Sequence, residues 1–307
     1  MGTPALAGVC LKALLDAPDV QVAAVVTQPD QPKGRGMKLQ ASPVKEIALA
    51  AGIPVLQPHR ARDEAFLGQL REFAPELIAV AAYGQILPAS VLELPKHGCL
   101  NVHTSLLPRY RGASPIQRAI LNGDTETGVT IMKMDAGMDT GDIVAQERTP
   151  IAPEDTAATL NDRLAVIGAE LLVKVIPRYV RGELKPHPQP AEGVSYAPKI
   201  RKEEGRIDWT QPARVIVNHV RGMNPWPGAF TQWPGSSGPV LLKIWEAEAT
   251  GRQSEPGVVL QAGRDGIVVG CGEGALKIRS LQKEGGRRLM AQEFLAGNPL
   301  RAGEKLL

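Results

Sequence analysis

The chain has 307 residues, of which 43% are hydrophobic, 22% charged and 4% aromatic. This length suits two domains of ordinary size, and the composition excludes a disordered chain. The 35 Lys and Arg residues against 32 Asp and Glu leave a formal charge of +3, which excludes a protein that binds nucleic acid over its whole surface. The scarcity of aromatic side chains argues against binding of single strands by base stacking.

The three cysteines, Cys10, Cys99 and Cys271, are far apart and odd in number. They indicate neither a disulfide framework nor a thiolate zinc site, and buried reduced thiols are typical of a cytosolic protein. No apolar run approaches the roughly 18 residues that a membrane-spanning helix needs. We therefore expect a cytoplasmic protein with no membrane association, and a monomer.

Strands and helices are expected to alternate over the first 180 residues or so. Helical spacing follows a Thr3 cap with Pro4 in the first turn, Ser42–Ala51 is a second helix, and Ser114-Pro115 starts a third. A long helix capped by Asp155 is expected to end near Pro177. Short apolar runs predict strands at Val20–Val26, Leu77–Ala82, Cys99–His103 and Thr127–Met134. This alternation predicts an α/β fold with a doubly wound, Rossmann-like parallel sheet over residues 1–181.

The pattern of the sequence changes after Arg181. Prolines 186, 188, 190 and 198 predict a stiff linker over residues 182–198. Beyond it, short runs separated by Gly-rich turns predict a small antiparallel, OB-like β-barrel over residues 199–307. The expected strands are Val240–Glu246, Gly257–Gln261, Gly266–Cys271 and Ala275–Leu281, with short helices at Val215–Val220 and Leu289–Leu295.

Two segments carry polar groups where ligands bind in a doubly wound sheet, beyond the carboxyl ends of its strands. Asn101 and His103 are two residues apart, so they face the same side of their strand. The loop Asp135–Asp142 follows the strand Thr127–Met134 and holds three carboxylates among glycines. If the two strands are neighbours, an amide, an imidazole and a carboxylate converge on one pocket.

Plainer interpretations stay open on spacing alone. Asn and His at a strand end often hydrogen-bond only to nearby backbone, and Asp in a D-x-G loop usually bonds its own turn. A zinc site would need about three protein ligands, and no second His lies near His103 in the sequence. No G-x-S-x-G elbow surrounds Ser105, so a serine nucleophile is not indicated. Spacing therefore indicates a small-molecule enzyme without naming its chemistry.

Longer motifs carry a resemblance. N-V-H-T-S-L-L-P at 101–108 and D-A-G-M-D-T-G-D-I at 135–143 resemble the two signatures of enzymes that use 10-formyltetrahydrofolate as a one-carbon donor. The whole chain resembles the methionyl-tRNA formyltransferase family through P-D-Q-P-K-G-R-G-M-K-L at 29–39, S-L-L-P-R-Y-R-G-A-S-P-I-Q at 105–117, S-Y-A-P-K-I at 195–200, E-E-G-R-I-D-W at 203–209 and N-P-W-P-G-A-F at 224–230.

The resemblance implies transfer of a formyl group from 10-formyltetrahydrofolate to the α-amino group of initiator methionyl-tRNA, with tetrahydrofolate as the second product and no metal. Asn101 and His103 would stabilise the charge that develops on oxygen, and Asp139 would orient His103 or relay protons. Which of His103 and Asp139 moves the proton is open. The stretch Ser105, Leu106, Leu107 and Pro108 matches the one associated with folate binding.

Contact with the tRNA is assigned to a second motif. The predicted loop Gln28–Gln40 carries Lys33, Arg35 and Lys38, which without the resemblance we would interpret as solvated surface charges. The family implies that this G-R-G loop reaches the acceptor end of the tRNA through Arg35. Residues 182–307 carry 17 basic and 13 acidic residues, against 18 and 19 in residues 1–181. The basic excess of the second part suits a domain that lies along phosphates.

Other classes are less well matched. A glycinamide ribonucleotide formyltransferase would lack the long C-terminal part, and a formyltransferase acting on an amino sugar nucleotide would have no need of the G-R-G loop. An RNA-binding module without activity would have no reason to keep Asn101, His103 and Asp139 together. Family members also carry a short apolar strand before M-G-T-P, with which this chain begins. We expect open apolar sheet edges where that strand would lie, and a true start upstream of Met1.

Overall fold

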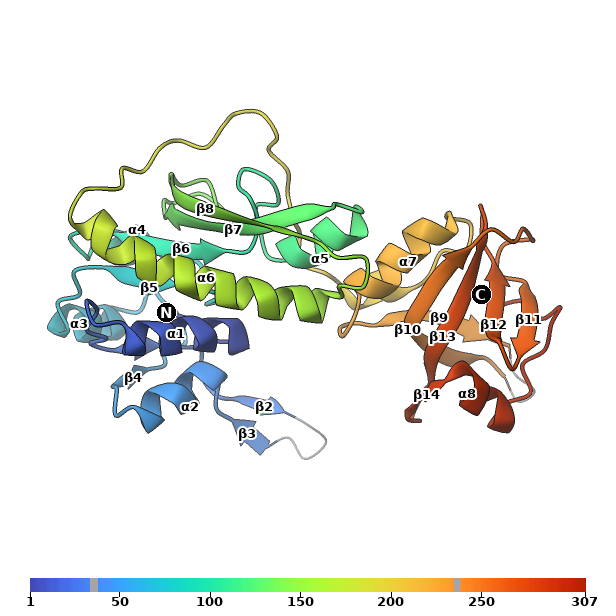
Figure 1. Cartoon of the computed structure of the whole chain (residues 1–307). Coiled ribbons are helices and arrows are strands. Elements are labelled where there is room, and N and C mark those ends of the chain that lie inside the picture. The colour runs from blue at the N-terminus through green and yellow to red at the C-terminus, as the bar shows by residue number, and fades with distance from the viewer. Residues whose placement is uncertain (34–37, 235–237) are drawn as a thin grey trace. The chain divides into compact units, whose positions relative to one another are not determined.

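A computed structural model describes residues 1–33, 38–234 and 238–307. The chain forms two compact units, shown in Figure 1. Unit 1 comprises Met1–Pro115, Glu126–Pro150 and Asn161–Ala197, and unit 2 comprises Ile116–Thr125, Ile151–Leu160 and Pro198–Leu307. The predicted boundaries of the first domain (1–181), the linker (182–198) and the C-terminal domain (199–307) stay a prediction.

Unit 1 combines helices with short strands, as the alternating pattern predicted. Its strands are β1 (Val25–Val26), β2 (Gln31–Lys33), β3 (Lys38–Gln40), β4 (Val55–Leu56), β5 (Ile78–Val80), β6 (Cys99–His103), β7 (Glu126–Lys133) and β8 (Ile143–Pro150). Its helices are α1 (Ala5–Asp16), α2 (Pro43–Ala50), α3 (Glu64–Glu72), α4 (Ala89–Leu92) and most of α6 (Ala157–Val180). The α/β class predicted for this region is confirmed.

The strand directions differ in part from the all-parallel prediction. β1 pairs with β4 and β5 with β6 in parallel, whereas β6–β7 and β7–β8 are antiparallel, in the order β5-β6-β7-β8. The loop between β7 and β8 is too short for the crossover that a parallel pair requires, so these two strands form a hairpin. β6 is the central strand beside this hairpin and all five of its residues are buried.

Two helix ends also differ from expectation. Pro4 rather than Thr3 occupies the N-cap of α1, and the Thr3 hydroxyl donates to the Tyr83 carbonyl 3.0 Å away. The long helix α6 begins two residues after Asp155, and Pro177 lies inside it rather than at its end. α2 begins after Ser42 as predicted, with the Ser42 Oγ accepting from the Lys45 N–H at 3.1 Å.

A cavity separates the β1–β4 pair from the four-stranded sheet. Of the predicted strand Val20–Val26 only Val25 and Val26 pair with a neighbour, and Met1 and Gly2 occupy the space beside them. The N–H of Gly2 donates to the Val26 carbonyl and the N–H of Ala81 to the Met1 carbonyl, at 3.0 and 2.9 Å. Residues 20–24 have no strand partner among the described residues.

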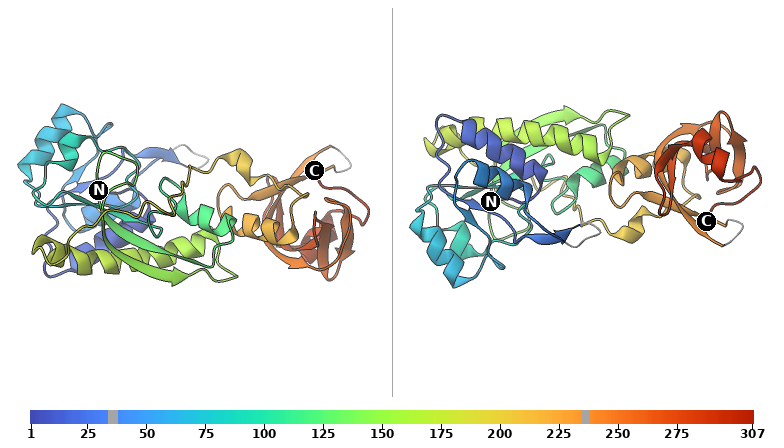
Figure 2. Two further views of the ribbon diagram at one scale, coloured as in Figure 1. Left: turned by 90° about the horizontal axis from the view of Figure 1, so that it is seen from above. Right: turned by 90° about the horizontal axis from the view of Figure 1, so that it is seen from below.

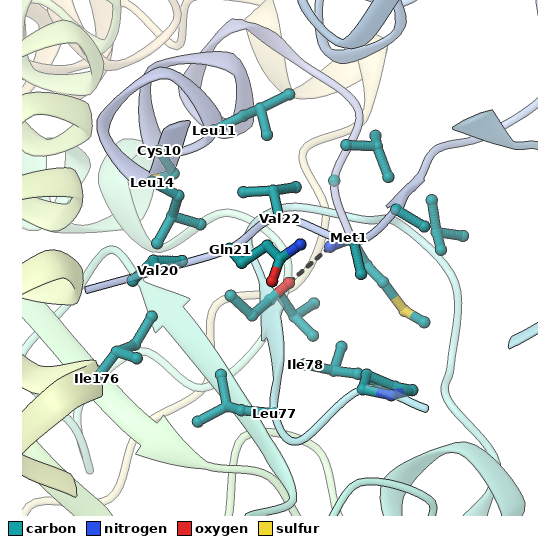
Figure 3. Close-up of a pocket in the computed structure, with 18 of the residues that line it drawn as sticks. Met1, Cys10, Leu11, Leu14, Val20, Gln21, Val22, Leu77, Ile78 and Ile176 are labelled. Carbon is teal, nitrogen blue, oxygen red and sulfur yellow. Dashed lines mark hydrogen bonds between the residues drawn. The ribbon is translucent and has the colours of Figure 1, made fainter. Parts of the chain in front are cut away.

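The cavity has a volume of about 590 Å³ and is lined mainly by apolar side chains. They come from both strand edges and from α1 and α6, which lie side by side in Figures 1 and 2. Figure 3 shows Leu11, Val22 and Ile176 around it, with the Met1 ammonium donating to the Ala79 carbonyl at 2.6 Å. Burial lowers the pKa of the Met1 α-amino group to about 6.

Unit 2 is built on an antiparallel sheet, as predicted. Its strands are β9 (Ala229–Trp233), β10 (Val240–Thr250), β11 (Val259–Gly263), β12 (Gly266–Gly270), β13 (Ala275–Lys283) and β14 (Arg288–Met290). The order is β11-β12-β13-β10-β9, with β14 paired to β13. Its helical elements are most of α5 (Pro115–Leu121), the 3-10 turn Lys202–Gly205, α7 (Ala213–Gly222) and α8 (Ala291–Gly297).

The last residues close this sheet into a barrel. Leu307 exchanges two backbone hydrogen bonds with Gln232 of β9, and Leu306 and Glu304 bond Gly257 and Val259 at the other edge. Figure 2 shows the strands wrapped around a common centre. Trp209, Ile244 and Phe294 belong to the apolar core inside, and the Trp209 Nε1 donates to the Thr231 hydroxyl at 3.0 Å.

All three cysteines are free and buried, which confirms their prediction as buried thiols. Burial raises the pKa of Cys10 and Cys271 to about 11 and that of Cys99 to about 12. No helix within the described ranges combines the length and apolar character needed to cross a membrane. The same ranges contain no group of three or more His, Cys, Asp or Glu able to hold a metal ion.

Candidate active site

The predicted site residues lie on β6 and on the loop that joins β7 to β8. Asn101 and His103 are both buried on β6, and their backbone partners on β7 are Met132 and Thr130. The two strands are neighbours, as the convergence argument required. They run antiparallel, however, so the loop begins beside the start of β6 and folds back to place Asp139 near His103.

His103 has defined surroundings on both ring nitrogens. Nε2 lies 2.9 Å from the Tyr110 carbonyl oxygen, and Nδ1 lies 3.6 Å from Oδ2 of Asp139. A carbonyl can only accept, so Nε2 carries a hydrogen and donates to Tyr110. In the neutral imidazole the lone pair is therefore on Nδ1, the nitrogen nearer to Asp139.

Burial lowers the pKa of His103 below its usual value. The Asp139 carboxylate and the hydrogen bond to Tyr110 act in the opposite direction and raise it. Burial is the larger effect, so the imidazole is neutral near pH 7 and Nδ1 is available to accept a proton. A proton received there is stabilised by the nearby carboxylate.

The carboxylates of the Asp135–Asp142 loop divide into different tasks. Asp135 makes the local turn bonds, accepting from the Gly137 N–H at 3.0 Å and the Thr140 hydroxyl at 2.7 Å. Asp139 instead accepts from the N–H of Gly112 at 2.8 Å, across the site on another loop. Asp135 therefore stabilises its own turn, as is usual for Asp in a D-x-G loop, whereas Asp139 bonds a different loop.

Unlike His103 and Asp139, Asn101 makes no side-chain hydrogen bond within the described part of the chain. It is only 9% exposed. A buried amide normally has partners, so an amide group left available in this position is suited to a ligand. Its NH2 can donate to an oxygen that gains negative charge.

The stretch Ser105–Pro108 follows β6 directly and is fixed by hydrogen bonds to other residues of the protein. The Ser105 hydroxyl donates to the Arg109 carbonyl at 2.6 Å, and the Leu107 N–H donates to the Thr130 hydroxyl at 3.1 Å. The Leu107–Pro108 peptide bond is cis. Of the four side chains, Ser105, Leu107 and Pro108 are buried and Leu106 is half-buried.

The basic residues assigned to tRNA lie in or beside the undescribed part of the Gln28–Gln40 region. Lys33 ends β2 and Lys38 begins β3, and the two strands pair antiparallel with Lys33 opposite Lys38. Arg35 lies outside the described residues. The structure therefore shows two short antiparallel strands where the sequence predicted only a loop.

Sequence reasoning missed the residues that hold the site together. Tyr110 fixes the tautomer of His103, and Gly112 binds the Asp139 carboxylate. A further contact comes from Gln189, whose Nε2 donates to the carbonyls of Asp139 and Gly141, both at 2.8 Å. Tyr110 and Gly112 lie in a motif already used for the resemblance, but nothing around Gln189 distinguishes it from a linker residue.

An amide donor, a neutral buried imidazole and a carboxylate form one constellation on the first unit. Such a site can stabilise charge on a carbonyl oxygen and take a proton from an attacking nucleophile. These are the requirements of acyl transfer, so the arrangement suits a group-transfer enzyme, although the α/β fold by itself implies no particular chemistry.

Comparison with known proteins gives the particular family. The family described as Formyl transferase matches residues 2–176, and Formyl transferase, C-terminal domain, matches residues 199–299. A methionyl-tRNA formyltransferase of Myxococcus xanthus is 52% identical over 305 residues, covering 99% of this chain and 96% of that protein. The chain belongs to the formyl transferase family.

Solved structures agree on the fold. WlaRD, a sugar 3N-formyl transferase, has a TM-score of 0.66 at 22% identity, covering 92% of this chain and 95% of that one. A methionyl-tRNA formyltransferase from Clostridium thermocellum has a TM-score of 0.52 at 20% identity, covering 74% and 93%. The solved structures confirm the predicted fold class, and the family match together with the curated relatives confirms the predicted enzyme class and resemblance.

Proposed function

We propose that this enzyme transfers the formyl group of 10-formyltetrahydrofolate to the α-amino group of initiator methionyl-tRNA. The observation that carries the proposal is the identity of about half of all residues with methionyl-tRNA formyltransferases over nearly the whole of both chains. Sugar formyltransferases share the fold at 22% identity, and that likeness supports the fold alone. The products are N-formylmethionyl-tRNA, used to start translation, and tetrahydrofolate.

In the proposed chemistry Asn101 stabilises the developing charge. Attack by the amine puts negative charge on the formyl oxygen, and the Asn101 NH2 has no competing partner among the described residues. A single positioned donor of this kind is worth about 3 kcal/mol of barrier in comparable sites. Its burial strengthens the interaction, because little water competes.

We assign the proton transfer to His103 rather than to Asp139. The attacking nitrogen must lose a proton as the new C–N bond forms, and N10 must gain one as its bond to the formyl carbon breaks. Nδ1 of His103 carries the lone pair, while Oδ2 of Asp139 is already bound to the Gly112 N–H. Asp139 then stabilises the imidazolium. The Nδ1–H of that imidazolium can first donate a hydrogen bond to the oxyanion and then pass its proton to N10 as the bond from N10 to the formyl carbon breaks.

The substrates are assigned to the regions that the resemblance implies. Folate is placed against Ser105–Pro108, where the partly exposed Leu106 offers apolar surface while Ser105 and Leu107 fix the turn. Arg35, Lys33 and Lys38 are assigned to the tRNA acceptor end, and residues 199–307 to the remaining tRNA contacts. The excess of four positive charges over residues 182–307 supports the latter. A monomer in the cytoplasm is the setting we propose.

The experiment that tests the function is direct. Purified protein is incubated with 10-formyltetrahydrofolate and either initiator or elongator methionyl-tRNA, and formyl-methionine is measured. We expect rapid formylation of the initiator and poor formylation of the elongator. Formylation of an amino sugar nucleotide with no reaction of either tRNA would overturn the proposal.

A further inference from the structure

We propose that residues 187–197, called the strap below, position the two loops of the active site through Gln189 and Ser195. This inference rests on the catalytic roles proposed above for His103 and Asp139. The sequence predicted only a stiff linker in this region. In the structure it runs along unit 1 as the long loop between α6 and α7 in Figure 1, and it is hydrogen-bonded to both loops.

Both ends of the strap are fixed by backbone hydrogen bonds. His187 and Ile143 exchange two of them at 2.9 and 3.0 Å, which fixes the strap where the Asp139 loop enters β8. At the other end the Ala197 N–H donates to the Arg111 carbonyl at 2.7 Å, and the Ser114 N–H donates to the Ala197 carbonyl at 3.1 Å. The strap therefore connects the loop that holds Asp139 with the loop that holds Tyr110.

The Gln189 side chain links the two loops directly. Its Nε2 donates to the Asp139 and Gly141 carbonyls, and its Oε1 accepts from Nε and Nη2 of Arg111 at 3.0 and 2.7 Å. Both donor hydrogens and both acceptor positions of the amide are used. Asp139 has a φ of 54°, a left-handed conformation that needs support from its surroundings.

Ser195 fixes the second of the two loops, the one that holds Tyr110, also through a side-chain hydrogen bond. Its hydroxyl accepts from the Tyr110 N–H at 2.9 Å, and the Tyr110 carbonyl in turn accepts from His103. Tyr110 also has a left-handed backbone, with a φ of 62°. The position of the His103 ring therefore depends on a residue that the strap holds by its N–H.

The turn between these contacts fits closely under the strap. Gly112, which donates its N–H to the Asp139 carboxylate, has a φ of 120°. A Cβ at this position would lie 2.8 Å from the Ala197 carbonyl oxygen. The 3.6 Å separation between His103 and Asp139 is thus set by residues that the strap contacts on both sides.

The test uses turnover, Michaelis constants and the pH dependence of turnover in the complete enzyme. Gln189→Ala and Gln189→Glu both remove the donors to the loop, and the latter keeps a partner for Arg111. We expect each to lower kcat about tenfold or more while KM for both substrates changes less than about twofold, since misplacement of reacting groups affects the chemical step. Glu192→Ala, at an exposed strap position, is the matched control and should behave as wild type.

The pH profile separates positioning from mere structural support. Asp139 raises the pKa of His103, so a displaced Asp139 lets that pKa fall further and moves the acid limb of kcat to lower pH. For Ser195, the alanine variant should lose activity and Ser195→Thr should restore it through the retained hydroxyl. A wild-type kcat in Gln189→Ala, or a loss of kcat that follows the loss of Tm with an unmoved acid limb, would overturn the proposal.

Asp139→Asn distinguishes failure of the strap from failure of the proposed chemistry. An inactive Asp139→Asn beside fully active Gln189→Ala and Ser195→Ala overturns the strap alone. A fully active Asp139→Asn overturns the catalytic role on which the strap depends.

Discussion

Nδ1 of His103 lies 3.6 Å from Oδ2 of Asp139, beyond the length of a direct hydrogen bond but well within reach of its charge. The other ring nitrogen is committed to the Tyr110 carbonyl, so the lone pair of the neutral ring is the one nearer the carboxylate. A proton that reaches Nδ1 therefore arrives where negative charge can stabilise it. This arrangement suits a base that is neutral before the reaction and charged during it.

Removing any of the three polar side chains should stop the reaction without unfolding the protein. We expect Asn101→Ala, His103→Ala and Asp139→Ala each to lower turnover at least about a hundredfold, because each removes a donor, a base or its stabilising charge. Single-turnover formylation with thermal unfolding as a parallel measurement checks this. Lys12→Ala, on an exposed position of α1, is the control, and near-normal turnover of folded His103→Ala would sink the assignment.

Turnover should persist at mildly acidic pH. Burial lowers the pKa of His103, and the active form is the neutral one, so kcat should fall only as the pH drops through a value below the ordinary 6.5. The measurement is kcat against pH at saturating substrates, which reports the enzyme–substrate complex. An acid limb above pH 7 would contradict the neutral-base role.

Arg35→Ala should affect the tRNA and spare the folate. Arg35 falls outside the described residues, so its role remains the prediction made from the G-R-G motif. We expect a raised KM for initiator tRNA or a lower kcat, with folate affinity unchanged, because Arg can bind phosphates and splayed bases at an acceptor end. An unchanged dependence of rate on tRNA concentration would refute it. Glu64→Ala, an exposed residue at the start of α3, serves as the control.

An apolar strand placed before Met1 should stabilise unit 1. Five or six β-branched residues span about 17–20 Å and can pair with residues 20–24, which have no strand partner among the described residues, while filling the cavity of about 590 Å³. Each buried side chain contributes about 1.5–3 kcal/mol, so Tm should rise by several degrees. A Gly/Ser extension of the same length is the control, and equal melting of the two extensions would count against the idea.

The gain from that extension should depend on pH in a stated direction. Burial lowers the pKa of the Met1 ammonium from 8.0 to about 6, so the unfolded chain binds more protons than the folded one between these values. The stability of the unextended chain therefore rises from pH 6 to pH 8. An extension replaces this ammonium by a peptide bond, so its advantage in Tm should be larger at pH 6 than at pH 8.

Sequence patterns predicted the α/β class, the antiparallel second unit, Asn101 and His103 on one side of their strand, and the carboxylates of the Asp135–Asp142 loop as polar groups to examine. These features depend on local pattern: apolar periodicity sets the elements, and alternation along β6 puts Asn101 and His103 on one side. The long motifs at 101–108 and 135–143 added the family and, through the resemblance, the choice of Asp139 among those carboxylates. Local pattern does not encode strand direction, so the antiparallel β7 and β8 were missed.

The contacts that surround these groups became visible in the tertiary structure alone. The tautomer of His103 depends on a carbonyl seven residues away, and the orientation of Asp139 depends on Gly112 and Gln189, which lie 27 and 50 residues from it. Such contacts connect residues by chain folding, so no spacing rule reveals them. For the same reason the Pro-rich segment read as a linker, because its composition reports stiffness and says nothing of the two loops it contacts.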